Sequence, residues 1–250
     1  MTIPRSYVFG AVFAIAAVAF ASVSGCTVWR IKQSAELARL SEPFQASPLT
    51  ASATMLVVGD STAVGTGASS PGNSLPGLLA RDHPTLKIVN RAKDGARYAD
   101  IVRQLEALGD QRFDFILLLG GGNDVIRFTA NEELEESIAG AAALARTHAR
   151  FVILMPSGNA GNAPFFFAPL SWLMTDRSRT LHRMVRQAAA ENSALYVNLF
   201  KEKADDPFAL RSDELHAKDG LHPNDAGYQL WYRELTSQAG LAEKLSALRR

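Results

Sequence analysis

The sequence MLVVGDST occupies residues 55–62. Its first four residues, Met55 to Val58, are apolar, and a glycine, an acid and a serine follow them. A short apolar run that ends in turn residues is typical of a strand buried on both faces of a sheet. Four similar runs follow along the chain: Leu86 to Val89, Phe113 to Leu119, Phe151 to Met155 and Ala194 to Leu199. Together they predict a parallel sheet of five strands.

Stretches with helical character lie between these runs. The clearest are Glu132 to His148 and Trp172 to Glu191, with Tyr98 to Leu108 and Ala226 to Ala239 as further candidates. Because each crossover between parallel strands places a helix on the sheet, alternating strands and helices predict a three-layer α/β/α sandwich.

Composition limits the kinds of protein that this chain can be. Its 250 residues are 47% hydrophobic, which suits one α/β domain, expected over residues 51–250. Lys and Arg total 26 against 25 Asp and Glu, so no positive excess indicates a nucleic-acid partner. Cys26 is the only cysteine, and no Cys/His cluster has zinc spacing, so we expect no disulfide, metal or cofactor.

The N-terminus is apolar, with no charged residue from Tyr7 to Val28. A membrane helix needs about 20 apolar residues and a signal-peptide core about 7 to 15, so residues 1–30 favour a membrane anchor over a cleaved signal. Cleavage near Ala21 and lipid attachment at Cys26 are the alternatives. Each would place a bacterial protein in the cell envelope, facing the periplasm or the exterior, although the flanking charges leave the orientation open. Residues 31–50 are expected to be a linker.

Polar residues follow three of the predicted strands. Ser61 follows the first strand, Gly95 the second and Asn123 the third. Ligands of parallel sheets bind at the carboxyl ends of the strands, so these residues are expected at one site. Ser61 is a candidate nucleophile or a simple helix cap. Asn123 is a candidate donor to an oxyanion or the centre of an Asx turn.

Asp219 and His222 stand three residues apart in the sequence DGLHP. A histidine base needs a partner on one ring nitrogen so that the other nitrogen is free, and Asp219 is close enough to be that partner. Ser61, Asp219 and His222 are therefore the candidate catalytic residues. The other histidines lack this setting and are expected to be solvated or packed in the core: His83, His148, His182 and His216.

Four motifs carry a resemblance to the SGNH (GDSL) hydrolase superfamily: GDS at 59–61, Gly95, GGND at 121–124 and DGLHP at 219–223. The resemblance spans about Thr54 to Leu235, with Thr62 where the GDSL name has Leu. It implies a flavodoxin-like fold and a serine esterase that works through an acyl-enzyme. It also implies an oxyanion hole formed by the N–H groups of Ser61 and Gly95 and the amide of Asn123, with Asp60 outside the triad.

Three consecutive phenylalanines, Phe165, Phe166 and Phe167, follow the fourth predicted strand. They are candidate substrate-binding residues, as an apolar wall for an acyl chain or a surface that enters lipid, and core packing is the alternative. The expected substrate is a small-molecule or lipid ester, as for a lysophospholipase or carboxylesterase. The alternatives are a polysaccharide O-acetylesterase and a catalytically silent binding module.

Overall fold

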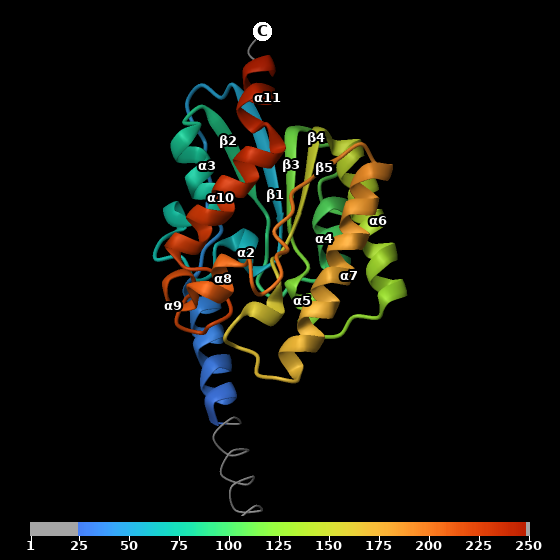
Figure 1. Ribbon diagram of the computed structural model, residues 1–250. Coiled ribbons are helices and arrows are strands. Elements are labelled where there is room, and N and C mark those ends of the chain that lie inside the picture. The colour runs from blue at the N-terminus through green and yellow to red at the C-terminus, as the bar shows by residue number, and fades with distance from the viewer. Residues whose placement is uncertain (1–24, 249–250) are drawn as a thin grey trace, which may run out of the picture.

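The computed structural model describes residues 25–248, which form three layers (Figure 1). A five-stranded parallel sheet in the order β2-β1-β3-β4-β5 is the middle layer, which confirms the predicted α/β/α sandwich. The strands are β1 (Ala53–Gly59), β2 (Leu86–Asn90), β3 (Phe113–Gly120), β4 (Ala149–Pro156) and β5 (Leu195–Tyr196).

Alternate residues of β1 enter two separate cores. Met55 and Val57 pack on the side covered by α3 (Leu75–Asp82), α10 (Asp225–Ala239) and α11 (Leu241–Leu248). Leu56 and Val58 pack on the side covered by α4 (Tyr98–Glu106), α6 (Asn131–His148) and α7 (Leu170–Glu191). All four side chains are fully buried, because helices cover both faces of the sheet. Burial on both faces explains why the strand is continuously apolar.

The last strand is shorter than the apolar run from Ala194 to Leu199 predicts. Only Leu195 and Tyr196 form β5, at the edge of the sheet. Beyond them, the N–H of Asn198 donates to Gln238 Oε1 of α10 rather than to a strand. A bond to α10 thus replaces the sheet ladder, and the chain leaves the sheet there.

Short helices and turns gather at the carboxyl ends of the strands: α2 (Ser61–Val64), η1 (Pro71–Asn73), α5 (Gly122–Ile126), η2 (Ala160–Asn162), α8 (Pro207–Leu210) and α9 (Ser212–Leu215). Gly59 ends β1 at this edge. A Cβ atom there would lie 1.9 Å from the carbonyl oxygen of Leu119 on β3, so the close approach of these strands requires glycine.

Residues 25–40 are helical and lie below the carboxyl edge of the sheet in Figure 1. This differs from the linker predicted over residues 31–50. Residues 35–40 are strong helix formers, and the helix ends shortly before Pro43, as expected from the restricted backbone around proline. Most of the predicted anchor over residues 1–30 lies outside the described residues. Within residues 25–248, no helix is long and apolar enough to cross a membrane.

Candidate active site

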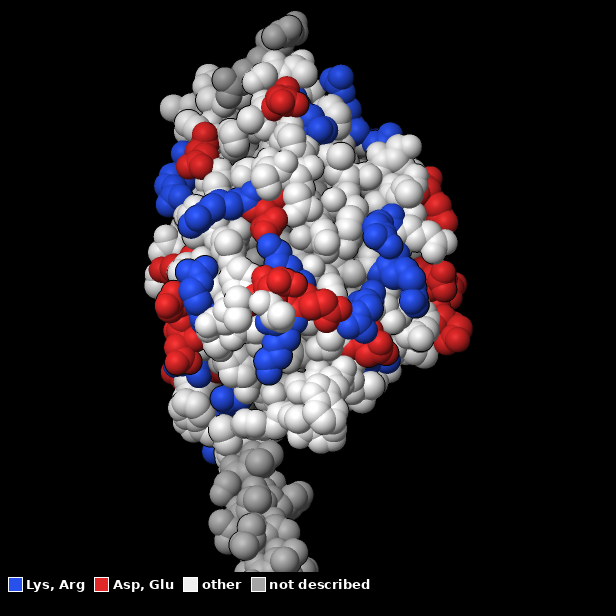
Figure 2. All heavy atoms as spheres, viewed as in Figure 1, with Lys and Arg blue, Asp and Glu red and all other residues white. Residues whose placement is uncertain are grey.

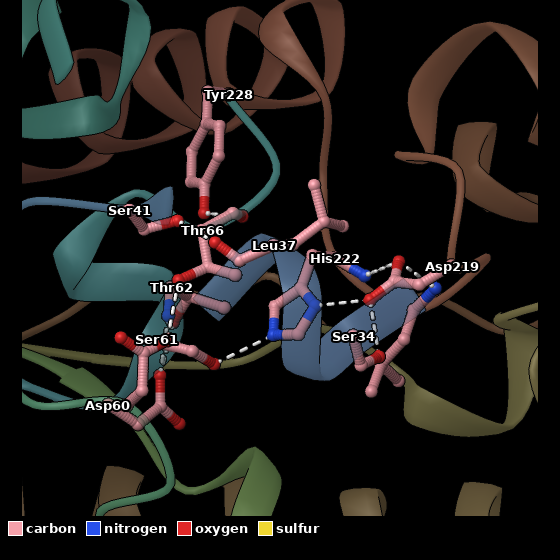
Figure 3. A network of polar contacts seen from close by, with 12 residues as sticks. Ser34, Leu37, Ser41, Asp60, Ser61, Thr62, Thr66, Asp219, His222 and Tyr228 are labelled. Carbon is pink, nitrogen blue, oxygen red and sulfur yellow. Dashed lines mark hydrogen bonds and ion pairs between the residues drawn. The ribbon is translucent and has the colours of Figure 1, made fainter. Parts of the chain in front are cut away.

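Ser61, His222 and Asp219 meet in one hydrogen-bonded chain (Figure 3). His222 Nε2 lies 2.8 Å from Ser61 Oγ, although the two residues are 161 positions apart in the sequence. His222 Nδ1 lies 2.6 Å from Asp219 Oδ2. All three side chains are buried. The structure therefore brings together the three residues that the sequence predicts as a catalytic group.

The loop that carries Asp219 and His222 is held by its own backbone. Asp219 Oδ1 accepts hydrogen bonds from the N–H groups of Leu221 and His222, at 3.0 and 3.1 Å. Gly220, which follows Asp219, has a φ of 68°, a left-handed conformation that favours glycine. The N–H of Ala217 donates to the carbonyl of His222 at 2.8 Å and closes the loop. These bonds fix the carboxylate and the imidazole relative to each other.

Asp219 remains ionised to low pH despite its burial. Burial alone would raise the pKa of its carboxyl group, but the hydrogen bond and charge of His222 lower it, with further hydrogen bonds from Ser34 and Leu221. The resulting pKa is about 2. The imidazole of His222 therefore faces a carboxylate that can compensate a positive charge on the ring.

The carboxylate of Asp60, next to Ser61 in the sequence, caps a helix and is not hydrogen-bonded to His222. Its Oδ1 accepts hydrogen bonds from the N–H of Thr62 at 2.9 Å and from Thr62 Oγ1 at 2.6 Å. Asp60 is thereby the N-cap of α2, the helix that begins with Ser61. Burial raises the pKa of its carboxyl group. Asp60 is a structural neighbour of Ser61, as the resemblance implies.

Gly95 and Asn123 line the same cavity as Ser61. Gly95 has a φ of 75°, and a Cβ atom there would lie 3.1 Å from the guanidinium of Arg127. Asn123 lies in the first turn of α5, which follows β3, and its side chain is partly exposed. The three residues predicted as an oxyanion hole therefore share one cavity.

The cavity has a volume of about 520 Å³. Ser61, Asn123 and His222 line it together with other polar residues, and the apolar part of the lining includes Ile31, Ala35, Ala38, Ile126, Ala160, Ala163, Phe165, Phe208, Leu221 and Trp231. Among residues 25–248, no group of three or more His, Cys, Asp or Glu side chains could hold a metal ion.

The phenylalanine loop contributes less to this cavity than predicted. Phe165 lines it, but Phe166 packs against the core beneath α7 and Phe167 is 40% exposed. Arg30 stands over the Phe167 ring, 5.2 Å from its centroid. Of the three rings, only Phe165 is placed where an acyl wall requires it; Phe166 fits the core-packing alternative, and exposed Phe167 fits the alternative of a surface that enters lipid.

Two of the other histidines, His182 and His216, form hydrogen bonds within the fold. His182 is buried in α7, where its ring nitrogens bond to Tyr196 Oη and to the carbonyl of Ser157. Burial lowers the pKa of His182 to about 4. His216 lines the cavity, but its Nδ1 lies 3.1 Å from the carbonyl oxygen of Ser212 in α9. Neither ring contacts Ser61.

Sequence reasoning missed the residues that the N-terminal helix brings to the site. Ile31, Ala35 and Ala38 line the cavity, and Ser34 Oγ donates to Asp219 Oδ2 at 2.6 Å. The run of helix formers over residues 35–40 could have indicated a helix, but no sequence signal indicates where such a helix packs.

Comparison with known proteins identifies the family of this chain. The model of the GDSL-like lipase/acylhydrolase family matches residues 57–230. Similar solved structures include LAE5, an α/β hydrolase enzyme from the metagenome of Lake Arreo, Spain, with 21% identity and a TM-score of 0.59 over 77% of this chain and 97% of that chain. TesA has 23% identity and a TM-score of 0.58 over 78% of this chain and 99% of that chain.

A catalytic mutant of Axe2, an acetylxylan esterase from Geobacillus stearothermophilus, is also similar, with 21% identity and a TM-score of 0.58 over 78% of this chain and 97% of that chain. At these identities the structures show a shared fold. No curated protein matches the chain. The family match covers most of the chain and includes the Ser61 and His222 motifs, so the protein belongs to the GDSL-like lipase/acylhydrolase family and is an ester-hydrolysing serine hydrolase.

Proposed function

We propose that the protein is a serine esterase whose triad is Ser61, His222 and Asp219. The observation that carries the proposal is the bonded chain from Ser61 Oγ through the His222 ring to Asp219 Oδ2, at 2.8 and 2.6 Å. In the first step, His222 Nε2 takes the proton of Ser61 as Oγ attacks the ester carbonyl. His222 then gives this proton to the leaving alcohol, and an acyl-enzyme is formed.

The negative charge on the carbonyl oxygen needs fixed donors. The N–H groups of Ser61 and Gly95 and the side-chain amide of Asn123 are the donors in this proposal, since all three residues line the cavity. In the second half of the cycle, His222 deprotonates a water that attacks the acyl-enzyme. Ser61 takes back its proton as the carboxylic acid leaves.

The apolar lining favours an ester with a sizeable acyl chain. A cavity of about 520 Å³, walled by residues such as Phe165, Phe208 and Trp231, can bury many more methylene groups than an acetyl ester contains. Lipid-like esters of the lysophospholipase or carboxylesterase type are therefore the proposed substrates. A series of p-nitrophenyl esters of increasing chain length, beside acetylated xylan and lysophosphatidylcholine, tests this choice. A preference for acetyl groups would favour a polysaccharide O-acetylesterase.

A fluorophosphonate probe tests the nucleophile, because it labels an activated serine covalently. The wild-type protein should be labelled and the Ser61→Ala variant should not. Ser246→Ala is the matched control, since the Ser246 hydroxyl bonds only to the carbonyl of Ala242 within its own helix. Equal labelling of wild type and Ser61→Ala would refute the assignment of the nucleophile.

We also propose that the enzyme is held at a membrane of the cell envelope through residues 1–30. The support is the uncharged run in the sequence and a set of exposed apolar side chains: Trp29, Ile31, Phe167, Leu170, Trp172 and Leu173. Figure 2 shows few charged side chains at the lower end of the molecule, where residues 25–40 and the start of α7 lie. Fractionation of cells, with mass spectrometry of the mature N-terminus, distinguishes an anchor, a lipoprotein at Cys26 and cleavage near Ala21. Recovery of the protein in the cytosol would contradict all three.

A further inference from the structure

Ser34 contacts the proposed triad from outside the matched family region. The family match covers residues 57–230, whereas Ser34 lies in the helix over residues 25–40. Its Oγ donates a hydrogen bond of 2.6 Å to Asp219 Oδ2, across 185 positions of sequence. The same oxygen accepts the bond from His222 Nδ1, so Ser34 and His222 share one acceptor atom (Figure 3).

Two further contacts hold the helix at this place. Glu36 forms an ion pair of 2.9 Å with Lys218, the residue before Asp219. Arg30 lies over the ring of Phe167, 5.2 Å from its centroid. Each contact is partly exposed and therefore weak by itself. They lie before and after Ser34 in the sequence, so the helix contacts the rest of the protein on both sides of this residue.

The helix also closes one side of the cavity. Ile31, Ala35 and Ala38 recur at intervals of three and four residues, so they share a face of the helix, and all three line the cavity. Ser34 lies on the same face and lines the cavity as well. One face of the helix thus supplies both an apolar wall and a hydrogen bond to the carboxylate.

We propose that the helix over residues 25–40 is a part of the active site, in which Ser34 positions Asp219 and Ala35 and Ala38 limit the acyl group that can bind. This inference rests on the proposed esterase function. The hydroxyl of Ser34 occupies a second lone pair of Oδ2 and restricts rotation of the carboxylate, which in turn orients the His222 ring. The helix wall sets the width of the cavity on this side.

Three variants of the full chain test the role of Ser34. In Ser34→Ala, kcat should fall about 10-fold with KM changed by less than about twofold, because a hydrogen bond to a charged group is lost and the ester contacts remain. Ser34→Thr keeps the hydroxyl and should retain most of the wild-type kcat. Ser41→Ala is the matched control, since Ser41 Oγ bonds only to the carbonyl of Leu37 in the same segment.

A spectroscopic measurement separates positioning from a general loss of structure. The low-field proton resonance of the His222 Nδ1–H should shift in Ser34→Ala and remain in place in Ser41→Ala. If Ser34→Ala keeps the wild-type kcat, or if its resonance does not move, the positioning role is wrong. An equal loss of kcat in Ser34→Ala, Ser34→Thr and Ser41→Ala would also overturn it.

A second pair of variants tests the wall. Ala38→Phe places a large ring in the cavity and should lower kcat/KM for octanoyl esters at least about 10-fold, with acetyl esters affected far less. Arg39→Phe adds the same ring at the next position, which is exposed and does not line the cavity, and should change neither. Equal effects of Ala38→Phe on both esters would overturn the wall.

Ser61→Ala, measured in parallel, separates this inference from the proposed function. If Ser61→Ala is inactive while Ser34→Ala and Ala38→Phe behave as the wild type, the esterase proposal stands and the role of the helix is refuted. If Ser61→Ala retains wild-type activity, the nucleophile is wrong and the role of the helix falls with it.

Discussion

The substitution Asp219→Asn tests which group orients His222. Asp219 Oδ2 accepts from His222 Nδ1 and Ser34 Oγ, and Oδ1 accepts from the N–H groups of Leu221 and His222. An asparagine has a single oxygen, so its NH₂ group must face one of these two pairs of donors. If NH₂ faces the ring, the stable tautomer carries its proton on Nε2 and cannot accept the proton of Ser61.

The expected loss of kcat is about 10⁴-fold, the size typical of a triad carboxylate replaced by its amide. The same carboxylate also contributes to stability. Its pKa of about 2 lies below the ordinary 3.8, and each pH unit corresponds to about 1.4 kcal/mol, so the ionised form contributes roughly 2 to 3 kcal/mol. Because the folded-state pKa is lowered, this contribution is present above about pH 4 and is lost as the pH falls toward 2.

Hydrolysis of p-nitrophenyl acetate gives kcat, and urea unfolding at pH 7 and pH 3 gives the stability. Asp225→Asn is the matched control, because the Asp225 carboxylate also accepts several hydrogen bonds, from Ser69 and Asn73, in a place where it does not contact His222. If Asp219→Asn is folded and keeps more than a tenth of the wild-type kcat, the reasoning about orientation is refuted.

Asn123→Ala should lower kcat about 10²- to 10³-fold with an unchanged Tm, and an unchanged kcat would remove Asn123 from the oxyanion hole. Phe165→Ala should lower kcat/KM for octanoyl esters about 10-fold more than for acetyl esters, with exposed Phe128→Ala as the control; equal losses on the two esters would contradict the acyl wall. Burial lowers the His182 pKa from 6.5 to about 4, so between these pH values the unfolded chain binds a proton that the folded protein does not. The wild type should therefore lose about 3 kcal/mol of its free energy of unfolding between pH 7 and pH 4, and His182→Gln should not show this loss. Urea unfolding at both pH values measures this, and parallel curves for wild type and variant would contradict it.

The strands were predictable because burial on both faces leaves a continuous apolar run. Met55 to Val58 lies inside β1, and Phe151 to Met155 lies inside β4. The convergence of Ser61 and His222 was also predictable. Parallel strands bring the segments that follow them to one edge of the sheet, and the four motifs suggested that the last segment returns to that edge. For Ser61 the strand order decides the position, whereas for His222 the motif was needed as well.

The contributions of residues 25–40 and of the phenylalanine loop were not predictable in this way. A helix on the rim of a sheet is placed by single contacts, such as the bond from Ser34 to Asp219, and a single contact leaves no periodic pattern in the sequence. The loop is neither a helix nor a strand, so the directions of the Phe165 and Phe166 side chains do not follow the repeat of either structure and cannot be read from the sequence pattern. Both segments lie at the edge of the fold or in irregular structure, where the local sequence pattern does not determine which residues a side chain contacts.

The choice between the two carboxylates of the site follows from their surroundings. Asp60 is next to Ser61 in the sequence, but its carboxylate caps α2 by accepting hydrogen bonds from Thr62. Burial raises the pKa of this carboxyl group. Asp219 gathers four hydrogen bonds and has a pKa of about 2. An imidazole that gains a proton needs an ionised partner, and Asp219 is hydrogen-bonded to the ring, whereas Asp60 accepts hydrogen bonds from Thr62. The surroundings lower the pKa of Asp219 and raise that of Asp60. Asp219 is therefore suited to orient His222, and Asp60 is suited to cap the helix that begins with Ser61.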